Sequence, residues 1–294
     1  MTSTSLRQTL SSGGRFAAHS ERGPRIWNAD HLAIAEHHLT SAITICDGAG
    51  DDIEAASCAR MAAETAAAAA AHTGMAMAGV GAARQAVEIY YQATPPGQDA
   101  TATIITAVLT NFSLNLAWAG DSQAFALTRD GMLHPLTKPY HPLRPEPRNV
   151  AAGPIHHRHI WLEHPGGDGP AEVLEISRLL LCSDGLTEKV THTHIAEVLR
   201  GGAPMPAAIC TELVDLAYTA GTHDNVTVAV IDLPDRTDPG SGAALQVVGA
   251  PLLPPRPPGA AVLTLTDAPT GARRRRRDRS TRRLSPRPVR VCAA

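Results

Sequence analysis

Acidic residues stand at the ends of four apolar, strand-like segments of this chain: Asp47, Asp121, Asp184 and Asp224. Aspartate next to glycine or asparagine is common in turns, so each acid taken alone is most simply a turn residue. The pair Asp130-Gly131, between two strand-like segments, is an example of that ordinary use in a hairpin. The question is whether the other acids have a second role.

Asp47 and Asp184 differ from the hairpin pair, because each follows a fully apolar run and precedes helix-like sequence. An acid at the end of a buried strand has a rigid position, and the glycine beside it lets the backbone approach closely and offer its carbonyl. Such hard oxygen donors suit Mg²⁺ or Mn²⁺. If Asp47, Asp184 and Asp224 converge, their repulsion is costly without cations, so we expect convergence and metal binding together.

The elements that would position these acids follow from hydropathy patterns and turn signals. Strands are expected over residues 31–36 and 42–47, then three between 101 and 128, two between 171 and 183, and a last one over 225–233. Helices are expected over 53–72, 82–93, 192–201 and 204–221, and a long loop over 135–169. This order predicts an α+β domain with layered sheets and helices.

Composition changes mark the expected domain boundaries. Residues 1–22 are rich in Ser and Gly and are interpreted as a flexible N-terminal segment. Residues 23–233 form the folded domain. Residues 234–294 contain "PLLPPRPPG" and "RRRRRDRSTRRLSPRPVR" and are interpreted as a largely disordered tail, since neither segment can pack a core.

The net charge of −2 conceals an acidic body and a basic tail. From Arg273 onward there are 10 Arg and one acid, which leaves 16 basic and 27 acidic residues before it. A body with a net charge near −11 is not expected to bind nucleic acid. The Arg cluster could contact anionic partners, namely nucleic acid, a membrane or the acidic body, or it could be a solvated, dispensable extension.

Cysteine usage and hydropathy suggest a cytoplasmic protein. The five cysteines are odd in number and form no C-x-x-C pair, which fits a reducing compartment. The N-terminus lacks the apolar region of a signal peptide, and no run approaches the about 18 apolar residues of a membrane helix. We expect a monomer without a membrane span.

Five motifs in order extend this interpretation: "R-x-x-N-x-D" (Arg25, Asn28, Asp30), "DGAG", "LAWAGDSQAFAL", "LLLCSDGL" and "GTHDNVTVAVI". Together they resemble the PPM family, the type 2C group of metal-dependent Ser/Thr protein phosphatases, in its bacterial form. The resemblance covers residues 23–233. It implies a β-sandwich of two antiparallel sheets flanked by helices, with a binuclear Mg²⁺/Mn²⁺ centre at one end, acting on phosphorylated Ser or Thr of proteins in bacterial signalling.

The same resemblance implies the site residues. Asp47 would bridge both cations, Gly48 would offer its carbonyl, and Asp184 and Asp224 would hold one cation of the pair. Asp121 would belong to a further, weaker metal site. Asp30 would act through a metal-bound water, and Arg25 would bind the substrate phosphate. A water activated by the two cations would attack phosphorus in line, without a protein nucleophile.

Several positions depart from the family pattern. Ala29 stands where the family usually has Glu, Asp51 and Asp52 replace a Gly and a His, and "LTKPYH" lacks an acid. The alternative function is therefore a phosphatase fold with weak or no catalysis that serves as a binding or scaffold protein.

Two further patterns were weighed as sites of other kinds. Ser122 in "AGDSQA" could resemble a serine-protease nucleophile, but Gln123 and Ala124 replace the glycines expected after it. "HHRH", residues 156–159, lacks the usual zinc-ligand spacing and is interpreted as part of a solvated loop.

Overall fold

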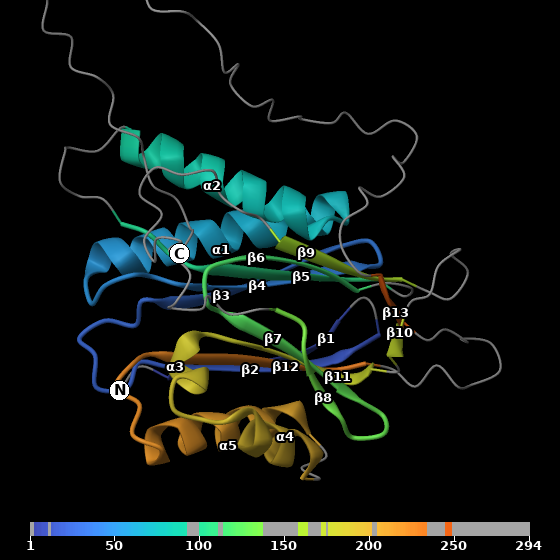
Figure 1. Cartoon of the computed structure of the whole chain (residues 1–294). Coiled ribbons are helices and arrows are strands. Elements are labelled where there is room, and N and C mark those ends of the chain that lie inside the picture. The colour runs from blue at the N-terminus through green and yellow to red at the C-terminus, as the bar shows by residue number, and fades with distance from the viewer. Residues whose placement is uncertain are drawn as a thin grey trace, which may run out of the picture.

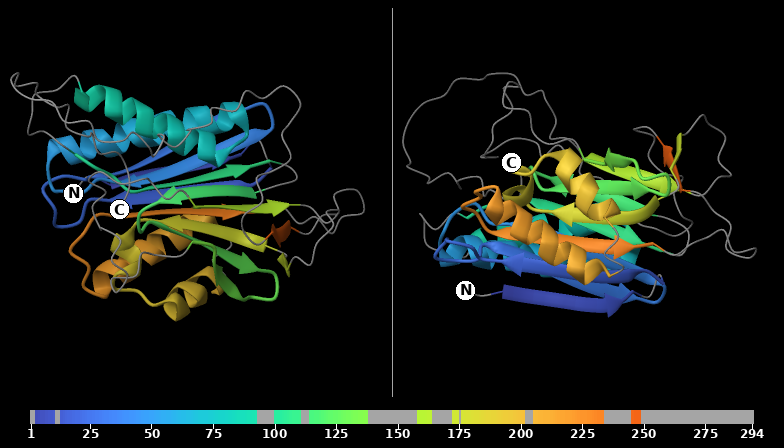
Figure 2. Two further views of the ribbon diagram at one scale, coloured as in Figure 1. Left: turned by 45° about the horizontal axis from the view of Figure 1, so that its top comes forward. Right: turned by 90° about the horizontal axis from the view of Figure 1, so that it is seen from below.

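Two antiparallel sheets are stacked face to face, and helices cover both outer faces of the sandwich (Figures 1 and 2). This computed structural model describes residues 3–10, 13–92, 100–110, 114–137, 158–163, 172–174, 176–201, 205–233 and 245–248. The order in the first sheet is β1-β2-β12-β11-β7-β8, and in the second it is β10-β13-β9-β6-β5-β4-β3. The predicted α+β sandwich is therefore confirmed.

The bounds of the elements largely match the expected ones. The strands are β1 (Ser3–Thr9), β2 (Arg15–Glu21), β3 (Asp30–His37), β4 (Thr40–Asp47), β5 (Ile104–Leu109), β6 (Leu114–Ala119), β7 (Gln123–Thr128), β8 (Leu133–Pro135), β9 (Arg158–Glu163), β10 (Glu172–Leu174), β11 (Ile176–Cys182), β12 (Val226–Asp232) and β13 (Leu245–Val248). The helices are α1 (Ile53–Thr73), α2 (Ala76–Gln92), α3 (Asp184–Thr187), α4 (His192–Arg200) and α5 (Pro206–Thr219).

Strand β4 shows why the sequences of the central strands are unbroken apolar runs. Ile43 and Ile45 face the other sheet, whereas Ala42 and Cys46 face the layer formed with α1 and α2. Both faces are thus covered, as in any sheet buried on two sides. The many alanines of α1 let that helix lie close to the second sheet, and α1 begins at the capping side chain of Asp52, which accepts from Ala55 N.

The interpretation of residues 1–22 as a flexible segment is wrong for the described residues. Strand β2 lies inside the first sheet, where it pairs with β1 and with β12. Phe16, Ala17 and Ala18 are buried there. The Ser- and Gly-rich composition concealed a strand whose partners lie about two hundred residues further along the chain, since Val226 pairs with Glu21.

Two other expectations need correction. Part of the predicted loop over 135–169 is strand β9, which pairs with β6 and β13. Residues 158 and 159 of "HHRH" therefore begin a strand, while residues 156 and 157 lie outside the described part. Within the predicted tail, Leu245–Val248 forms β13, a short apolar strand that pairs with β9 on one side and with β10 on the other. The other tail residues lie outside the description.

No helix among the described residues combines the length and hydropathy needed to span a lipid bilayer.

Candidate metal centre

Asp30 and Asp47 lie side by side at one end of the second sheet. Asp30 is the first residue of β3 and Asp47 the last of β4, and their Cα atoms are direct partners in the antiparallel ladder. This follows from the hairpin itself, because a strand that starts at an acid and returns to an acid of matching register places both carboxylates at one end. Asp30 is buried.

Asp184 and Asp224 reach the same end from the first sheet. Asp184 follows the end of β11, and Asp224 precedes the start of β12 by two residues. Ser183 joins the two sheets here, since its Oγ donates to Asp30 Oδ2 at 2.7 Å and accepts from Thr227 N at 3.0 Å. The acids that the sequence predicted to converge therefore come from two sheets that meet at one end of the sandwich.

The pKa values of these acids report their crowding. Burial, followed by the charges of Asp184 and Asp224, raises the pKa of Asp30 to about 7 although hydroxyl groups donate to it. Burial, followed by the charge of Asp30, raises the pKa of Asp47 well above its usual range, and a hydrogen bond with Asp184 adds to this. Burial and then the charge of Asp121 raise the pKa of Asp184 to about 6. Bound cations would relieve this repulsion.

Asp121 lies in the turn between β6 and β7, at the edge of this cluster, close enough for its charge to act on Asp184. The next residue, Ser122, is buried, and its Oγ lies 2.7 Å from the hydroxyl oxygen of Thr103. Ser122 is thus part of the turn that carries Asp121, and the serine-nucleophile alternative has no support.

The glycines beside the two key acids are sites of close backbone approach. A Cβ at Gly48 would lie 2.4 Å from Ala55 O, and one at Gly185 would lie 2.0 Å from Asn225 O. Gly48 also donates its N–H to Ala29 O at 3.0 Å. Both glycines are therefore required for the main chain at the acids to pack against neighbouring segments.

Gly185→Ala is expected to destabilise the fold by about 2–3 kcal/mol, because the new methyl group meets a backbone carbonyl that cannot rotate away. Thermal or urea unfolding measures the change. Gly81→Ala in α2 is the control, since nothing lies within 4 Å of its added Cβ and alanine favours a helix. Equal stability of the two variants would contradict the close packing around Asp184.

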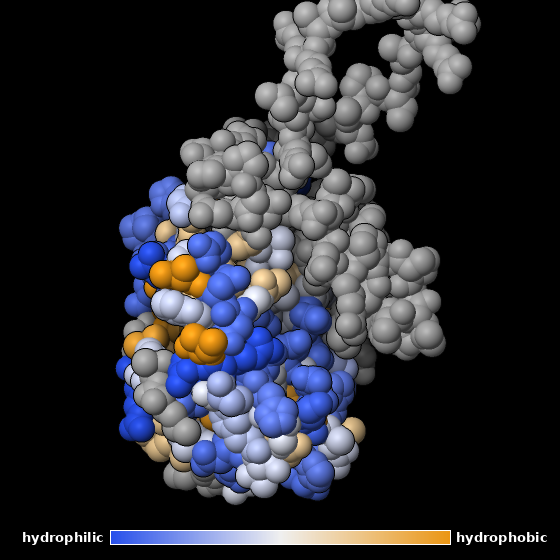
Figure 3. Space-filling model, turned by 90° about the vertical axis from the view of Figure 1, so that its left-hand side faces the viewer, coloured by the Kyte–Doolittle hydropathy of each residue, from blue (hydrophilic) through white to orange (hydrophobic). Residues whose placement is uncertain are grey.

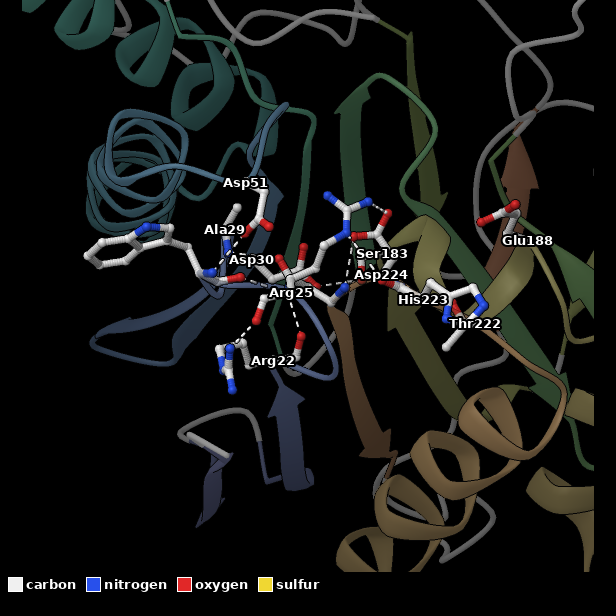
Figure 4. Close-up of polar contacts among 12 residues, drawn as sticks. Arg22, Arg25, Ala29, Asp30, Asp51, Ser183, Glu188, Thr222, His223 and Asp224 are labelled. Carbon is white, nitrogen blue, oxygen red and sulfur yellow. Dashed lines mark hydrogen bonds and ion pairs between the residues drawn. The ribbon is translucent and has the colours of Figure 1, made fainter.

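Arg25 lies beside Asp224 at the mouth of the cluster (Figure 4). Its Nη2 donates to Asp224 Oδ2 at 2.7 Å, and its Nε donates to His223 O at 3.2 Å. The side chain is 34% exposed, so the guanidinium group is held in place and still reaches solvent. This combination suits a group that receives a phosphate.

Three positioning residues escaped the sequence analysis. Asn225 donates from Nδ2 to Arg22 O and Trp27 O and accepts from Ala29 N, which ties the segment carrying Arg25 to β12. Asp51 accepts from two backbone N–H groups of the same segment. Ser183 holds Asp30. The only signal was a short polar residue near a key acid, with Ser183 and Asn225 adjacent to one and Asp51 four residues after Asp47, and it did not reveal these partners.

The donor set fits hard divalent cations. Carboxylates and a backbone carbonyl are the ligands these ions prefer, and Asp30 Oδ1 is a buried acceptor with no hydrogen-bond partner among the described residues. Among the described residues, no group of three or more His, Cys, Asp or Glu side chains is arranged so that it could hold a metal ion. Mg²⁺ keeps several waters in its protein sites and needs few carboxylates.

Several known proteins are similar to this chain in sequence or in fold. No family model matches the chain. The sequence is 33% identical over 152 residues to the serine/threonine protein phosphatase PstP of Mycobacterium tuberculosis, and 28% identical over 184 residues to rat protein phosphatase 1F. These matches cover 48% and 50% of this chain but only 29% and 40% of those proteins, so the chain spans less than half of their length.

Solved structures extend the comparison to the fold. The catalytic domain of PstP in complex with two manganese ions is 27% identical, with a TM-score of 0.58, 76% of this chain covered and 99% of that chain. In fold and motifs this chain is similar to the phosphatases of the PPM family. Stp1 from Staphylococcus aureus, at 16% identity and a TM-score of 0.60, shares the fold over 75% of this chain and 95% of that chain. In this chain the acids Asp30, Asp47, Asp184 and Asp224 lie at the end of the sandwich where the two sheets meet.

Proposed function

We propose that this chain is a Mg²⁺- or Mn²⁺-dependent phosphatase that hydrolyses phosphoserine or phosphothreonine in proteins. One observation supports this above all: acids from both sheets, crowded enough to raise each other's pKa, lie beside an arginine that reaches solvent. The PstP catalytic domain, solved in complex with two manganese ions, supports the choice of metal.

The residues that would hold two cations are Asp47, Asp184 and Asp224, together with the Gly48 carbonyl. Asp121 would serve a further, weaker site. When bound, the cations lower the pKa of a water so that hydroxide is available near neutral pH to attack phosphorus.

The chain's own side chains bind and orient the substrate. Arg25 offers a planar fork of donors to the phosphate oxygens and would exchange its contact with Asp224 for the substrate. Asp30 is fixed by the Ser183 hydroxyl at 2.7 Å, which leaves Oδ1 to orient a water. These groups keep their places because Asn225 and Ser183 tie the loops that carry them to β12.

A cytoplasmic location is part of the same proposal. The four cysteines among the described residues, Cys46, Cys58, Cys182 and Cys210, are free and buried, which fits a reducing compartment. A monomeric state and any contact of the Arg-rich tail with anionic partners stay predictions.

Metal removal tests the proposal. The protein is expected to hydrolyse p-nitrophenyl phosphate and a phosphothreonine peptide when Mn²⁺ or Mg²⁺ is present. Exhaustive chelation with EDTA should abolish turnover, added metal should restore it, and serine-directed inhibitors should leave it intact. Turnover that persists after chelation would contradict the metal mechanism. No turnover with either metal would favour the non-catalytic scaffold function.

A further inference from the structure

Two large apolar side chains stand in solvent immediately beside Arg25. Ile26 is 74% exposed and Trp27 is 41% exposed, on the segment that joins β2 to β3. A single exposed apolar residue needs no explanation, but two adjacent ones at the mouth of a site form a feature to be explained. Figure 3 views this end of the molecule and shows apolar residues set among hydrophilic ones.

The main chain beneath these side chains is fixed. Asp51 accepts from Ile26 N at 3.1 Å through Oδ2 and from Trp27 N at 2.7 Å through Oδ1. On the other side, Asn225 Nδ2 donates to Trp27 O at 3.0 Å, and Arg22 Nη1 donates to the Arg25 carbonyl. The close-up in Figure 4 shows Arg22 and Arg25 on this segment and Asp51, which reaches it from the loop between β4 and α1. The exposed side chains are therefore presented by a rigid backbone.

Asp51 also connects this segment to a third apolar residue. Ile53, two positions after Asp51, is the first residue of α1 and is 51% exposed. Exposed apolar side chains thus lie on both segments that the Asp51 hydrogen bonds join, namely Ile26 and Trp27 on one and Ile53 on the other. The residue that departs from the family pattern at position 51 has a definite task, which is to hold the Arg25 segment against the start of α1.

We propose that Ile26, Trp27 and Ile53 form a subsite for a bulky apolar side chain of the substrate, next to its phosphorylated residue. This inference rests on the proposed function, because the phosphate at Arg25 fixes where the substrate chain runs. Residues adjacent in an extended peptide lie about 3.3–3.8 Å apart, so the residues that flank a phosphorylated residue held at Arg25 stay within a few residue lengths of Ile26 and Trp27. A pre-organised apolar surface binds such a side chain at little ordering cost.

The test compares two phosphothreonine peptides that differ only in the residues flanking the phosphothreonine, leucine in one and serine in the other. Parent protein is expected to prefer the leucine peptide about tenfold in kcat/KM, mainly through KM, since the contact is the same before and during reaction. The double variant Ile26→Ser/Trp27→Ser should bring the ratio close to one. Trp27→Phe should retain most of the preference.

The ratio between the two peptides is the decisive quantity, because it cancels any general loss caused by disturbing Arg25. Leu39→Ser is the matched control: Leu39 is 59% exposed in the turn after β3, at the opposite end of that strand from Asp30, and its loss should leave the ratio unchanged. A parent ratio near one, or a preference that survives in the double variant, would overturn the subsite.

Failure of the proposed function is distinguishable from failure of the subsite. Turnover of p-nitrophenyl phosphate with Mn²⁺ tests catalysis without any flanking residue. If that turnover is absent, fluorescence anisotropy of the same two peptides, labelled, still measures the preference in binding. A leucine preference that the double variant removes would support the subsite, and equal binding of the two peptides would overturn it.

Discussion

Asp47→Asn is expected to lower turnover of a phosphate ester by ~10²–10³-fold or more, while leaving the metal-free fold at least as stable as the parent. The loss of turnover follows because asparagine cannot serve as the anionic bridge between two cations. The unchanged stability follows from the crowding of the acids, since Asp47 is half-buried and burial, with the charges of Asp30 and Asp184, raises its pKa well above the usual range.

The sign of the stability effect can be worked out. A raised pKa in the folded state means that this carboxyl stabilises the fold only at low pH and loses that contribution as pH rises through the folded pKa. At pH 8, above the ordinary pKa of aspartate, the metal-free parent carries a cost for holding this acid among other carboxylates, and asparagine, which does not titrate, does not.

Metal should reverse the ranking of the two proteins. With Mn²⁺ at a hundredfold excess over Kd, the parent gains about 2.7 kcal/mol, and Asp47→Asn should gain much less. Thermal melts with and without Mn²⁺ measure both quantities. Asp130→Asn is the control, since Asp130 lies in the exposed β7–β8 hairpin and the chemical change is the same. Equal metal-induced shifts in the parent and Asp47→Asn would show that Asp47 is only a turn residue.

Much of the fold could be predicted from the sequence because its strands are buried on both faces. An unbroken apolar run such as "RLLLC" is a direct consequence of that burial, and the acid that ends it marks the edge of the sheet. Strand β2 was not predicted, because its pattern of alternating apolar and polar residues is short and lies next to a Ser- and Gly-rich stretch. Its pairing with β12 is a long-range contact that no local sequence pattern indicates.

The site could be predicted only in part, for a related reason. The types of the acids indicated metal chemistry, but their convergence from two sheets came from the family resemblance, since Ser183 and Asp30 are 153 residues apart in sequence. In the sequence, Asp51 could be identified only as a departure from the family pattern. Asp51 accepts hydrogen bonds from the main-chain N–H groups of Ile26 and Trp27. Every residue except proline has such a group, so the sequence does not indicate this pairing.

Arg25→Ala is expected to lower kcat/KM for p-nitrophenyl phosphate about 100-fold, the second largest effect. Charge-assisted bonds from a guanidinium strengthen as negative charge grows on the phosphoryl oxygens, so their loss falls more on the transition state than on binding. Arg25→Lys keeps the charge without the planar fork and should recover only part of the activity.

The response to metal separates Arg25 from Asp47. Arg25 donates to Asp224 at 2.7 Å, so its removal frees a proposed cation ligand and should leave the Mn²⁺-induced stabilisation intact or larger. Arg15→Ala is the matched control, because Arg15 forms its ion pair with Asp232 at the far end of β2, and its loss should leave kcat/KM unchanged. If Arg25→Ala retains kcat/KM within about twofold, another group must hold the phosphate. If it instead loses the metal response as Asp47→Asn does, then Arg25 acts by positioning Asp224 rather than by touching the substrate.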